Sequence, residues 1–276
     1  MANLTLMAVL AHPDDEAFGL GGTLSRYAAE GCDVYLVTAT RGEAGQIAEP
    51  DMATKANLPQ VRERELRCAC QVYGIHPPFF LDYVDGQLPI VHQGQAVGKI
   101  VRLIRELRPQ VLITFGPDGI YGHYDHIAAY RWSIIAVELA SDPRCFPEDM
   151  EGACQPHQVN KVYFRTLTKE QVRALSEEID GRPAAVMMDG VPFYFVGRPE
   201  DEITTVIDVS AYVDQKRRGI ACHITQVGRH NPYVETPEAV MSDPNFQREI
   251  FVLDRSTVRR LEGVEEDLFW GVREGE

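Results

Sequence analysis

The sequence is short of basic residues. It contains 27 Lys and Arg against 41 Asp and Glu, for a formal net charge of −14 at pH 7. Nucleic acids and anionic membrane surfaces both favour a basic face, so we expect neither as the main partner. A neutral or weakly charged small molecule is compatible with this charge, and a divalent cation would suit an acidic site.

Long apolar runs are also absent. No stretch approaches the roughly 18 to 20 apolar residues that a membrane span needs. The apolar run at residues 4–11 has no basic flank and continues directly into acidic residues, which is not the pattern of a signal peptide. We therefore expect a cytoplasmic protein that does not associate with a membrane.

Cysteines are few and scattered, at positions 32, 68, 70, 145, 154 and 222. Their spacing matches neither a disulfide framework nor a cysteine metal site. Cys68 and Cys70 lie two apart in a helix-like segment and therefore point to different faces. The sequence predicts six reduced thiols.

What the sequence does contain is an alternation of strand-like and helix-like segments. Continuously apolar runs predict buried strands at 5–11, 33–39 and 111–115, and a short strand is expected at 77–81. Helices are predicted at 18–30, 59–73, 95–107 and 127–139. This alternation indicates right-handed βαβ units. The expected fold is α/β, a Rossmann-like three-layer sandwich with a mainly parallel sheet.

The pattern is weaker after about residue 141. It predicts strands at 161–166 and 204–209 and helices at 169–179 and 211–225. No repeat, low-complexity segment or linker interrupts the chain. We expect a single domain over residues 1–276, with its core in 1–140 and 160–226 and a C-terminal extension at 227–276.

Histidines and aspartates gather after two of the predicted strands. His12, Asp14 and Asp15 follow the first strand, and His123 and His126 follow the strand at 111–115. Because ligands bind outside the carboxyl ends of the strands in open parallel sheets, these residues are expected to meet at one edge. A catalytic zinc needs about three N or O ligands and one open position. His12, Asp15 and His126 would supply those ligands.

Asp14 has a different predicted role. Neighbours in an extended segment point in opposite directions, so Asp14 is not expected to ligate alongside Asp15. It is placed to act as general base toward metal-bound water, whose pKa zinc lowers from about 15.7 to about 7. His123, three residues before His126, would donate a proton or stabilise the oxyanion.

Each motif has a structural alternative. The HPDD segment could be a turn followed by a helix cap, and the HxxH pair could be two surface histidines. Two other functions also use these features: two histidines and a carboxylate bind iron in non-haem oxygenases, and Gly19, Gly21 and Gly22 suggest a non-catalytic nucleotide-binding module. The α/β pattern and the adjacent Asp14 argue against an oxygenase, and GxGxxG does not follow a strand.

These motifs resemble those of the PIG-L/LmbE-like family of zinc-dependent de-N-acetylases. The similarity rests on AHPDDE at 11–16, TRGEAG at 40–45 and the stretch 108–126, which ends in GHYDH. Weaker similarity at 215–226 follows a Lys…His-x-x-Gln pattern seen in members related to mycothiol and bacillithiol biosynthesis.

The resemblance implies a Rossmann-like fold and hydrolysis of an N-acetyl amide on an N-acetylglucosamine-type substrate. It implies metal ligands at His12, Asp15 and His126, a general base at Asp14, and assistance to the tetrahedral intermediate from His123. Zn²⁺ is the expected cofactor, and Fe²⁺ or another divalent cation is compatible with the same ligands. The expected partner is a small N-acetylated sugar conjugate, and a homo-oligomer is compatible with the sequence.

Further candidate substrate contacts lie on loops or near the weaker motif. They are Arg41, Glu43, Asp118, Tyr124 and His223. Tyr124 stands where proline is common in the family, so the local turn is expected to differ. The alternative for Arg41 and Glu43 is an ordinary surface charge pair. The charged run at 62–67 and the basic cluster at 216–218 are predicted to be solvated.

Overall fold

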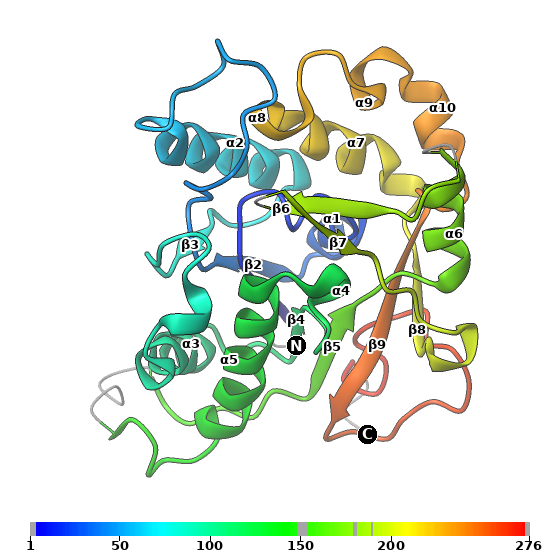
Figure 1. Ribbon diagram of the computed structural model, residues 1–276. Helices are drawn as coiled ribbons and strands as arrows, with labels where there is room; N and C mark the ends of the chain where they lie inside the picture. Colours follow the sequence, from blue (N-terminus) through cyan, green and yellow to red (C-terminus); the bar gives the residue numbers. More distant parts are fainter. Residues whose placement is uncertain (1–3, 148–153, 179–180, 189, 274–276) are drawn as a thin grey trace.

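The computed structural model describes residues 4–147, 154–178, 181–188 and 190–273, and its centre is a seven-stranded sheet in the order β3-β2-β1-β4-β5-β9-β8 (Figure 1). The strands are β1 (Thr5–Leu10), β2 (Asp33–Thr38), β3 (Phe79–Phe80), β4 (Val111–Thr114), β5 (Lys161–Arg165), β8 (Thr205–Asp208) and β9 (Arg248–Ser256). Neighbours among β1 to β5 are parallel, whereas β9 is antiparallel to β5 and β8. A separate hairpin joins β6 (Ala185–Met188) and β7 (Val191–Tyr194). The predicted α/β class with a mainly parallel sheet is confirmed.

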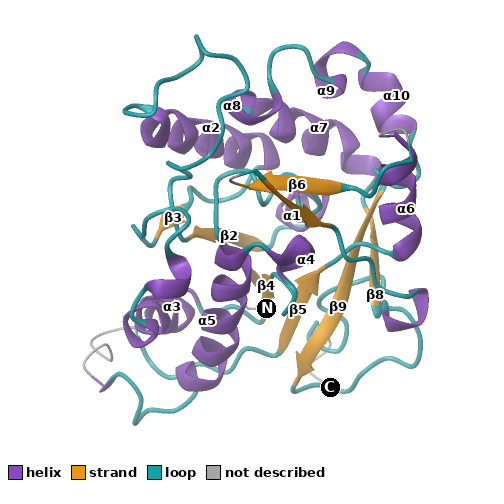
Figure 2. Ribbon diagram, in the orientation of Figure 1, coloured by secondary structure: helices purple, strands orange, loops and turns teal. Residues whose placement is uncertain are grey.

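Helices cover the sheet on both sides (Figure 2). The longer ones are α1 (Gly21–Ala29), α2 (Leu58–Tyr73), α3 (Gln93–Leu107), α5 (Tyr124–Ala140), α6 (Lys169–Glu178) and α7 (Val213–Cys222). The shorter ones are α4 (Gly119–Gly122), α8 (Ile224–Val227), α9 (Pro232–Glu235) and α10 (Pro237–Ser242), with 3₁₀ turns at Leu88–Ile90, Glu200–Glu202 and Ser210–Tyr212. Helices α1, α2 and α7 pack together, and α3 packs on α5. Among the described helices, none is both long and apolar enough to span a membrane.

Strand β1 lies in the interior of the sheet, between β2 and β4. All six of its residues are buried, because β2 and β4 flank it and helices cover both faces. Its register pairs Leu6 with Val34 on one side and with Val111 on the other. The chain proceeds outward from β1 through β2 to β3 in one direction and from β4 to β5 in the other. The carboxyl ends of β1 and β4 therefore border the crevice where doubly wound sheets bind their ligands.

Two predicted features differ from the structure. The first helix begins at Gly21 instead of residue 18, because the preceding turns contain positive φ angles at Asp14 (109°) and Gly19 (122°). In the segment predicted as a C-terminal extension, β9 lies inside the sheet between β5 and β8. Its residues Phe251 and Leu253 belong to the main hydrophobic core, so this segment contributes to the central sheet.

The prediction of six free thiols was wrong for one pair. Cys68 and Cys222 form a disulfide between α2 and the end of α7, with their Cα atoms 5.9 Å apart. The two cysteines are separated by 154 positions in sequence. Spacing along the chain cannot reveal this pairing, since it arises from the packing of two distant helices.

Breaking this cross-link should lower stability. We expect Cys68→Ser to reduce the free energy of unfolding by about 2–4 kcal/mol, because the disulfide restricts the unfolded chain over a long loop. Urea denaturation with and without a thiol reductant measures the effect, and Cys145→Ser is the matched control because Cys145 lies outside any disulfide. A wild-type stability that did not respond to reductant would contradict the expectation.

Close contact between α2 and α7 depends on a glycine. A Cβ atom added to Gly219 would overlap the hydroxyl and ring of Tyr73, whose side chain is buried between the helices. We expect Gly219→Ala to destabilise the protein by about 1–3 kcal/mol through overpacking. Thermal or urea unfolding measures this, with Gly94→Ala as control, since Gly94 is exposed in the first turn of α3. Equal stability of the two variants would show that Tyr73 can move aside.

Candidate active site

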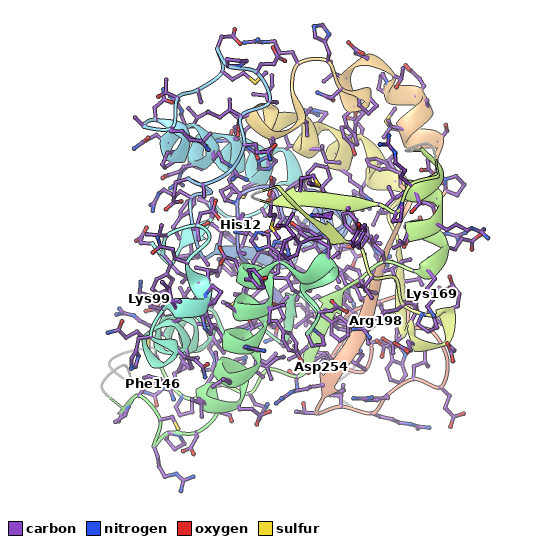
Figure 3. The ribbon with its side chains drawn as sticks, in the orientation of Figure 1. His12, Lys99, Phe146, Lys169, Arg198 and Asp254 are labelled. Atoms are coloured by element: carbon purple, nitrogen blue, oxygen red, sulfur yellow. A yellow bond between two sulfur atoms is a disulfide. The ribbon has the colours of Figure 1, made fainter. Side chains whose placement is uncertain are left out.

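The segment after β1 is a tight turn tied together by Asp15. The Oδ2 atom of Asp15 accepts hydrogen bonds from the backbone N–H groups of Ala11 (3.2 Å) and His12 (2.6 Å). These bonds fold the chain back at the strand end, so that the side chains of His12 and Asp15 share one site. Figure 3 marks the position of His12 in the molecule.

Three side chains predicted as metal ligands come together here. The potential ligand atoms of His12, Asp15 and His126 all lie within 4.8 Å of one another, and the three residues are buried. His12 and Asp15 come from the turn after β1, whereas His126 lies in the first turn of α5, which follows β4. The reversal of strand order between β1 and β4 is what brings them together.

The hydrogen bonding of His126 suits a cation. Its Nδ1 atom lies 3.1 Å from the carbonyl oxygen of Gly119, which can only accept, so Nδ1 carries the proton. The opposite Nε2 atom therefore presents a lone pair. It is buried, lies 3.1 Å from Asp15 Oδ1, and has no hydrogen-bond partner within the described part of the chain. Two buried lone pairs that face each other are unfavourable unless a positive charge lies between them.

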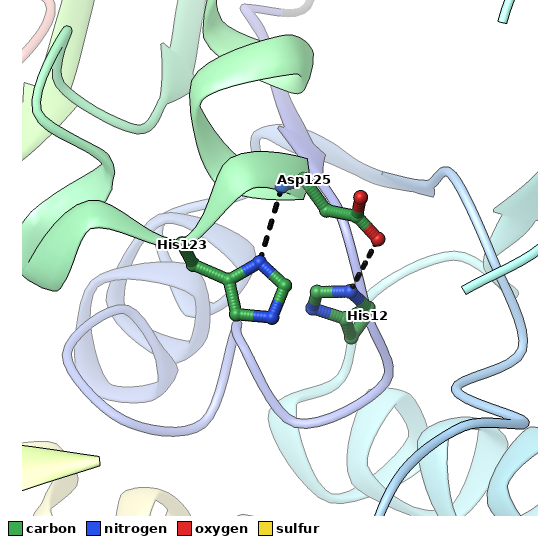
Figure 4. A group of neighbouring side chains, drawn as sticks. All are labelled: His12, His123 and Asp125. Atoms are coloured by element: carbon green, nitrogen blue, oxygen red, sulfur yellow. Dashed lines mark hydrogen bonds and ion pairs between the residues drawn. The ribbon is translucent and has the colours of Figure 1, made fainter. Parts of the chain in front are cut away.

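His12 is oriented by two carboxylates. Its Nε2 atom lies 3.0 Å from Asp85 Oδ1 and 3.1 Å from Asp125 Oδ2, and Figure 4 shows the contact with Asp125. With Nε2 donating to these acids, Nδ1 faces Asp15 Oδ2 at 3.5 Å. Burial disfavours the charged form, yet contacts with Asp125, Asp15 and Asp85 raise the pKa of His12 well above its usual value. The surroundings of His12 thus attract positive charge, and a bound cation would take the place of the proton.

Asp14 lies beside this cluster in a different environment. Burial raises the pKa of its carboxyl to about 6, while the nearby Arg62 guanidinium opposes the rise. The Nη2 atom of Arg62 lies 3.0 Å from Asp14 Oδ2 and also donates to the carbonyl of Pro13. A carboxylate that titrates near neutrality can accept a proton efficiently.

His123 caps α5 and faces the same cluster. Its Nδ1 atom accepts the backbone N–H of Asp125 at 3.1 Å (Figure 4), so the ring proton of the neutral form lies on Nε2. Burial lowers the pKa of His123 to about 4, so that the side chain is neutral at pH 7. Its ring lies 4.8 Å from the His12 ring, centroid to centroid. A neutral imidazole here can donate an N–H to a developing oxyanion.

A buried pair of side chains, Glu16 and His223, stabilises the turn that contains Asp14. Glu16 accepts a 2.6 Å hydrogen bond from His223 Nε2 on one carboxylate oxygen and a 3.1 Å bond from the Asp14 backbone N–H on the other. The Glu16 and His223 side chains are completely buried. His223, predicted as a substrate contact, therefore lies behind Asp14 in this structure and holds the backbone of that residue through Glu16.

The other predicted substrate contacts, Arg41, Glu43, Asp118 and Tyr124, have partners of their own. Arg41 pairs with Glu63 and Asp82, and its backbone N–H donates to Glu43. Asp118 caps α4 and forms a 2.7 Å ion pair with Arg198. The Tyr124 side chain is 62% exposed and makes an edge-to-face contact with Phe193 of β7, so it is the most accessible of these candidates.

Two carboxylates beside His12, Asp125 and Asp85, had no predicted role. Asp125 is fully buried and accepts the N–H groups of Gly86 and Leu88 besides contacting His12. A hydrogen bond from His12 lowers the pKa of Asp85 to about 2, although burial opposes the shift. Asp125 stands within the GHYDH motif, so its position was a usable signal, whereas nothing in the sequence marks Asp85.

The prediction that residues 62–67 form a solvated face was wrong for Arg62 and Glu65. Arg62 is 3% exposed and donates to the Gly42 carbonyl and to Asp14, and Glu65 accepts the N–H and hydroxyl of Thr225. Both share the inner face of α2 with Leu66 and Ala69. The helical period carries this signal, because buried positions of α2 recur three or four residues apart.

Comparison with known proteins places this site in a family. The family profile described as PIG-L, GlcNAc-PI de-N-acetylase, matches residues 7–137, which include both histidine motifs. Two relatives named 1D-myo-inositol 2-acetamido-2-deoxy-alpha-D-glucopyranoside deacetylase are similar over most of their length. The one from Thermobispora bispora is 36% identical over 84% of this chain and 82% of its own. The one from Streptomyces griseus is 34% identical over 97% of this chain and 88% of its own length.

A solved structure agrees in fold. The N,N'-diacetylchitobiose deacetylase from Pyrococcus horikoshii superimposes with a TM-score of 0.68, covering 91% of this chain and 84% of its own, at 16% sequence identity. At that identity the likeness concerns the fold alone. The two relatives, in contrast, are 36% and 34% identical to this chain over 84% and 97% of its length. The chain therefore belongs to the PIG-L family.

Proposed function

We propose that this protein is a zinc-dependent N-deacetylase acting on an N-acetylglucosamine conjugate, with N-acetylglucosaminyl-inositols as the first substrates to test. The observation that carries the proposal is the buried, unpaired Nε2 of His126 facing the Asp15 carboxylate, with His12 completing a set of three ligands. Two imidazoles and one carboxylate are a donor set that zinc accepts in catalytic sites. The deacetylase activity named for the two inositol-glycoside relatives supports the substrate class.

The residues around this set have separate roles. A divalent ion held by His12, Asp15 and His126 would polarise the acetyl carbonyl and acidify water. Asp14 accepts the proton of the attacking water, which its raised pKa favours, and Arg62 orients the Asp14 carboxylate. His123 donates its Nε2–H toward the oxyanion. Asp85 and Asp125 fix the His12 ring, as outer-shell carboxylates do for metal-bound histidines.

The nucleotide-binding alternative finds no support in the glycine cluster. The free N–H groups at the start of α1 are those that would hold a phosphate. Here the carboxylate of Glu249 accepts the N–H groups of Gly22 (3.1 Å) and Thr23 (2.7 Å). This helix terminus is already occupied by a side chain of the protein. The α/β fold also argues against the oxygenase alternative, because the iron sites of such oxygenases usually lie in β-rich barrels.

Removal of the metal is the first test. Chelation with EDTA should reduce acetate release from N-acetylglucosaminyl-inositol to background, and added Zn²⁺ should restore it. Acetate release and bound metal are measured on the same samples, with N,N'-diacetylchitobiose as a second substrate. Full activity in metal-free protein would contradict a metal-dependent mechanism. Restoration by Fe²⁺ but not by Zn²⁺ would contradict the assignment of zinc.

A further inference from the structure

A cavity of about 530 Å³ lies outside the cluster just described. It is bordered by the ends of β5 and β9, by α6, α7 and α10, and by the turn before α1. Helices α6, α7 and α10 lie in the upper right of Figure 1. A volume of this size falls in the range of small-molecule sites, about 300 to 1,000 Å³. None of the roles assigned above uses this space.

The walls of the cavity are largely apolar. Phe18, Tyr233 and Phe246 form a continuous aromatic side, with ring centroids 6.3 Å apart for the first two and 6.2 Å for the last two. Leu175 and Ile220 add aliphatic surface from α6 and α7. Such walls favour a ligand with a flat or branched apolar body.

One cation in the cavity lacks adequate partners. Arg165, the last residue of β5, is 8% exposed, and its Nε atom has no hydrogen-bond partner within the described residues. Its hydrogen bond, from Nη1 to the Asp15 carbonyl, is long at 3.4 Å. The guanidinium lies against Gly19, where a Cβ would come within 2.8 Å of Nη2. A buried guanidinium with unused donors is costly unless an anion meets it.

The other charges of the cavity are already balanced or exposed. Lys216 is held by Glu249 at 3.1 Å and by the Phe246 carbonyl at 2.8 Å, so its predicted solvation was wrong. The Glu249 carboxylate also accepts two backbone N–H groups at the start of α1, so its negative charge is already compensated. Arg248 and Asp243 line the rim and are exposed. Within the cavity, Arg165 is therefore the cation that a ligand would neutralise.

We propose that this cavity is a second small-molecule site, which binds a monoanion with an apolar or aromatic body, such as an aryl carboxylate. The anionic group meets the guanidinium of Arg165, which lines the cavity, and the apolar body packs against Phe18, Tyr233 and Phe246. Charge and apolar surface are both needed. A small anion has no apolar body to pack against the aromatic wall, and a neutral ring system has no negative charge to pair with Arg165.

Calorimetric titration of the metal-loaded protein with three probes tests both requirements. We expect 2-naphthoate to bind at least about tenfold more tightly than 2-naphthamide or acetate, because a charged hydrogen bond contributes about 1.5–3 kcal/mol. Arg165→Gln should reduce 2-naphthoate affinity by at least about tenfold. Equal affinities for the acid and the amide would overturn the proposal.

A second variant separates this cavity from the metal cluster and does not alter a buried residue. Ala239 lies on the exposed side of α10 and lines the cavity, so Ala239→Trp should fill it and abolish 2-naphthoate binding while acetate release stays unchanged. Glu238→Trp, on an exposed neighbour that does not line the cavity, is the matched control and should bind normally. Binding that survives in Ala239→Trp but is lost in His126→Ala would place 2-naphthoate at the metal cluster and refute the proposal.

Discussion

The Asp14→Asn variant should retain its bound metal and lose most of its hydrolytic activity. Asp14 is not one of the three clustered ligand residues, so the donor set of His12, Asp15 and His126 stays complete. An amide cannot accept the proton of the attacking water, and loss of a general base typically costs about 10²- to 10⁴-fold in rate. Initial rates of acetate release and metal content per protein, taken together, measure the two effects.

The choice of asparagine matters at this position. Asp14 has a φ of 109°, a region that asparagine tolerates better than alanine. Asparagine therefore tests the proton acceptor with little disturbance of the turn that positions His12 and Asp15. Asp201→Asn, on an exposed acidic residue, is the matched control and should be fully active. An Asp14→Asn variant that kept wild-type activity would show that another group takes the proton.

The His126→Ala variant should lose both metal and activity. The substitution removes the Nε2 lone pair that would bind the metal, and only two of the three proposed metal ligands remain. We expect metal affinity to fall by more than about 100-fold, because replacing even an outer-shell partner commonly costs about 10- to 100-fold. Metal titration of the chelated protein gives the affinity, and acetate release at saturating Zn²⁺ gives the residual activity.

A histidine outside the site controls for nonspecific effects. His230 has an 86% exposed side chain and pairs only with Glu235 among the ion pairs described. His230→Ala should bind metal and release acetate like the wild type. If His126→Ala also bound zinc with unchanged affinity, the ligand set proposed here would be wrong, and the alternative group of His12, His123 and Asp125 would have to be considered.

The sequence by itself determined the central framework and the place of the site. The runs at 5–10, 33–38 and 111–114 are mostly apolar because strands covered on both faces need few polar side chains. A parallel sheet then directs the ends of such strands to one edge, so His12 and His126 could be expected to meet without coordinates. Local chemistry and the regular geometry of βαβ units were sufficient for this.

Only the tertiary structure decided which partners complete the site. Asp85 lies on a loop with no motif, and its contact with His12 depends on how that loop folds over the crevice. The Glu16–His223 pair and the Cys68–Cys222 disulfide join positions 207 and 154 residues apart. No local pattern specifies such contacts, because they follow from the packing of α7 on α1 and α2.

The same reason explains the second cavity. Its cation comes from β5 and its aromatic wall from the turn before α1, α9 and the loop that leads to β9. In the sequence, Arg165 is an unremarked residue at a strand end. Its burial with unused donors is set by Gly19 and by the position of β9 beside β5. Burial of a charge is a property of the assembled chain, so it could be seen only after folding had brought these segments together.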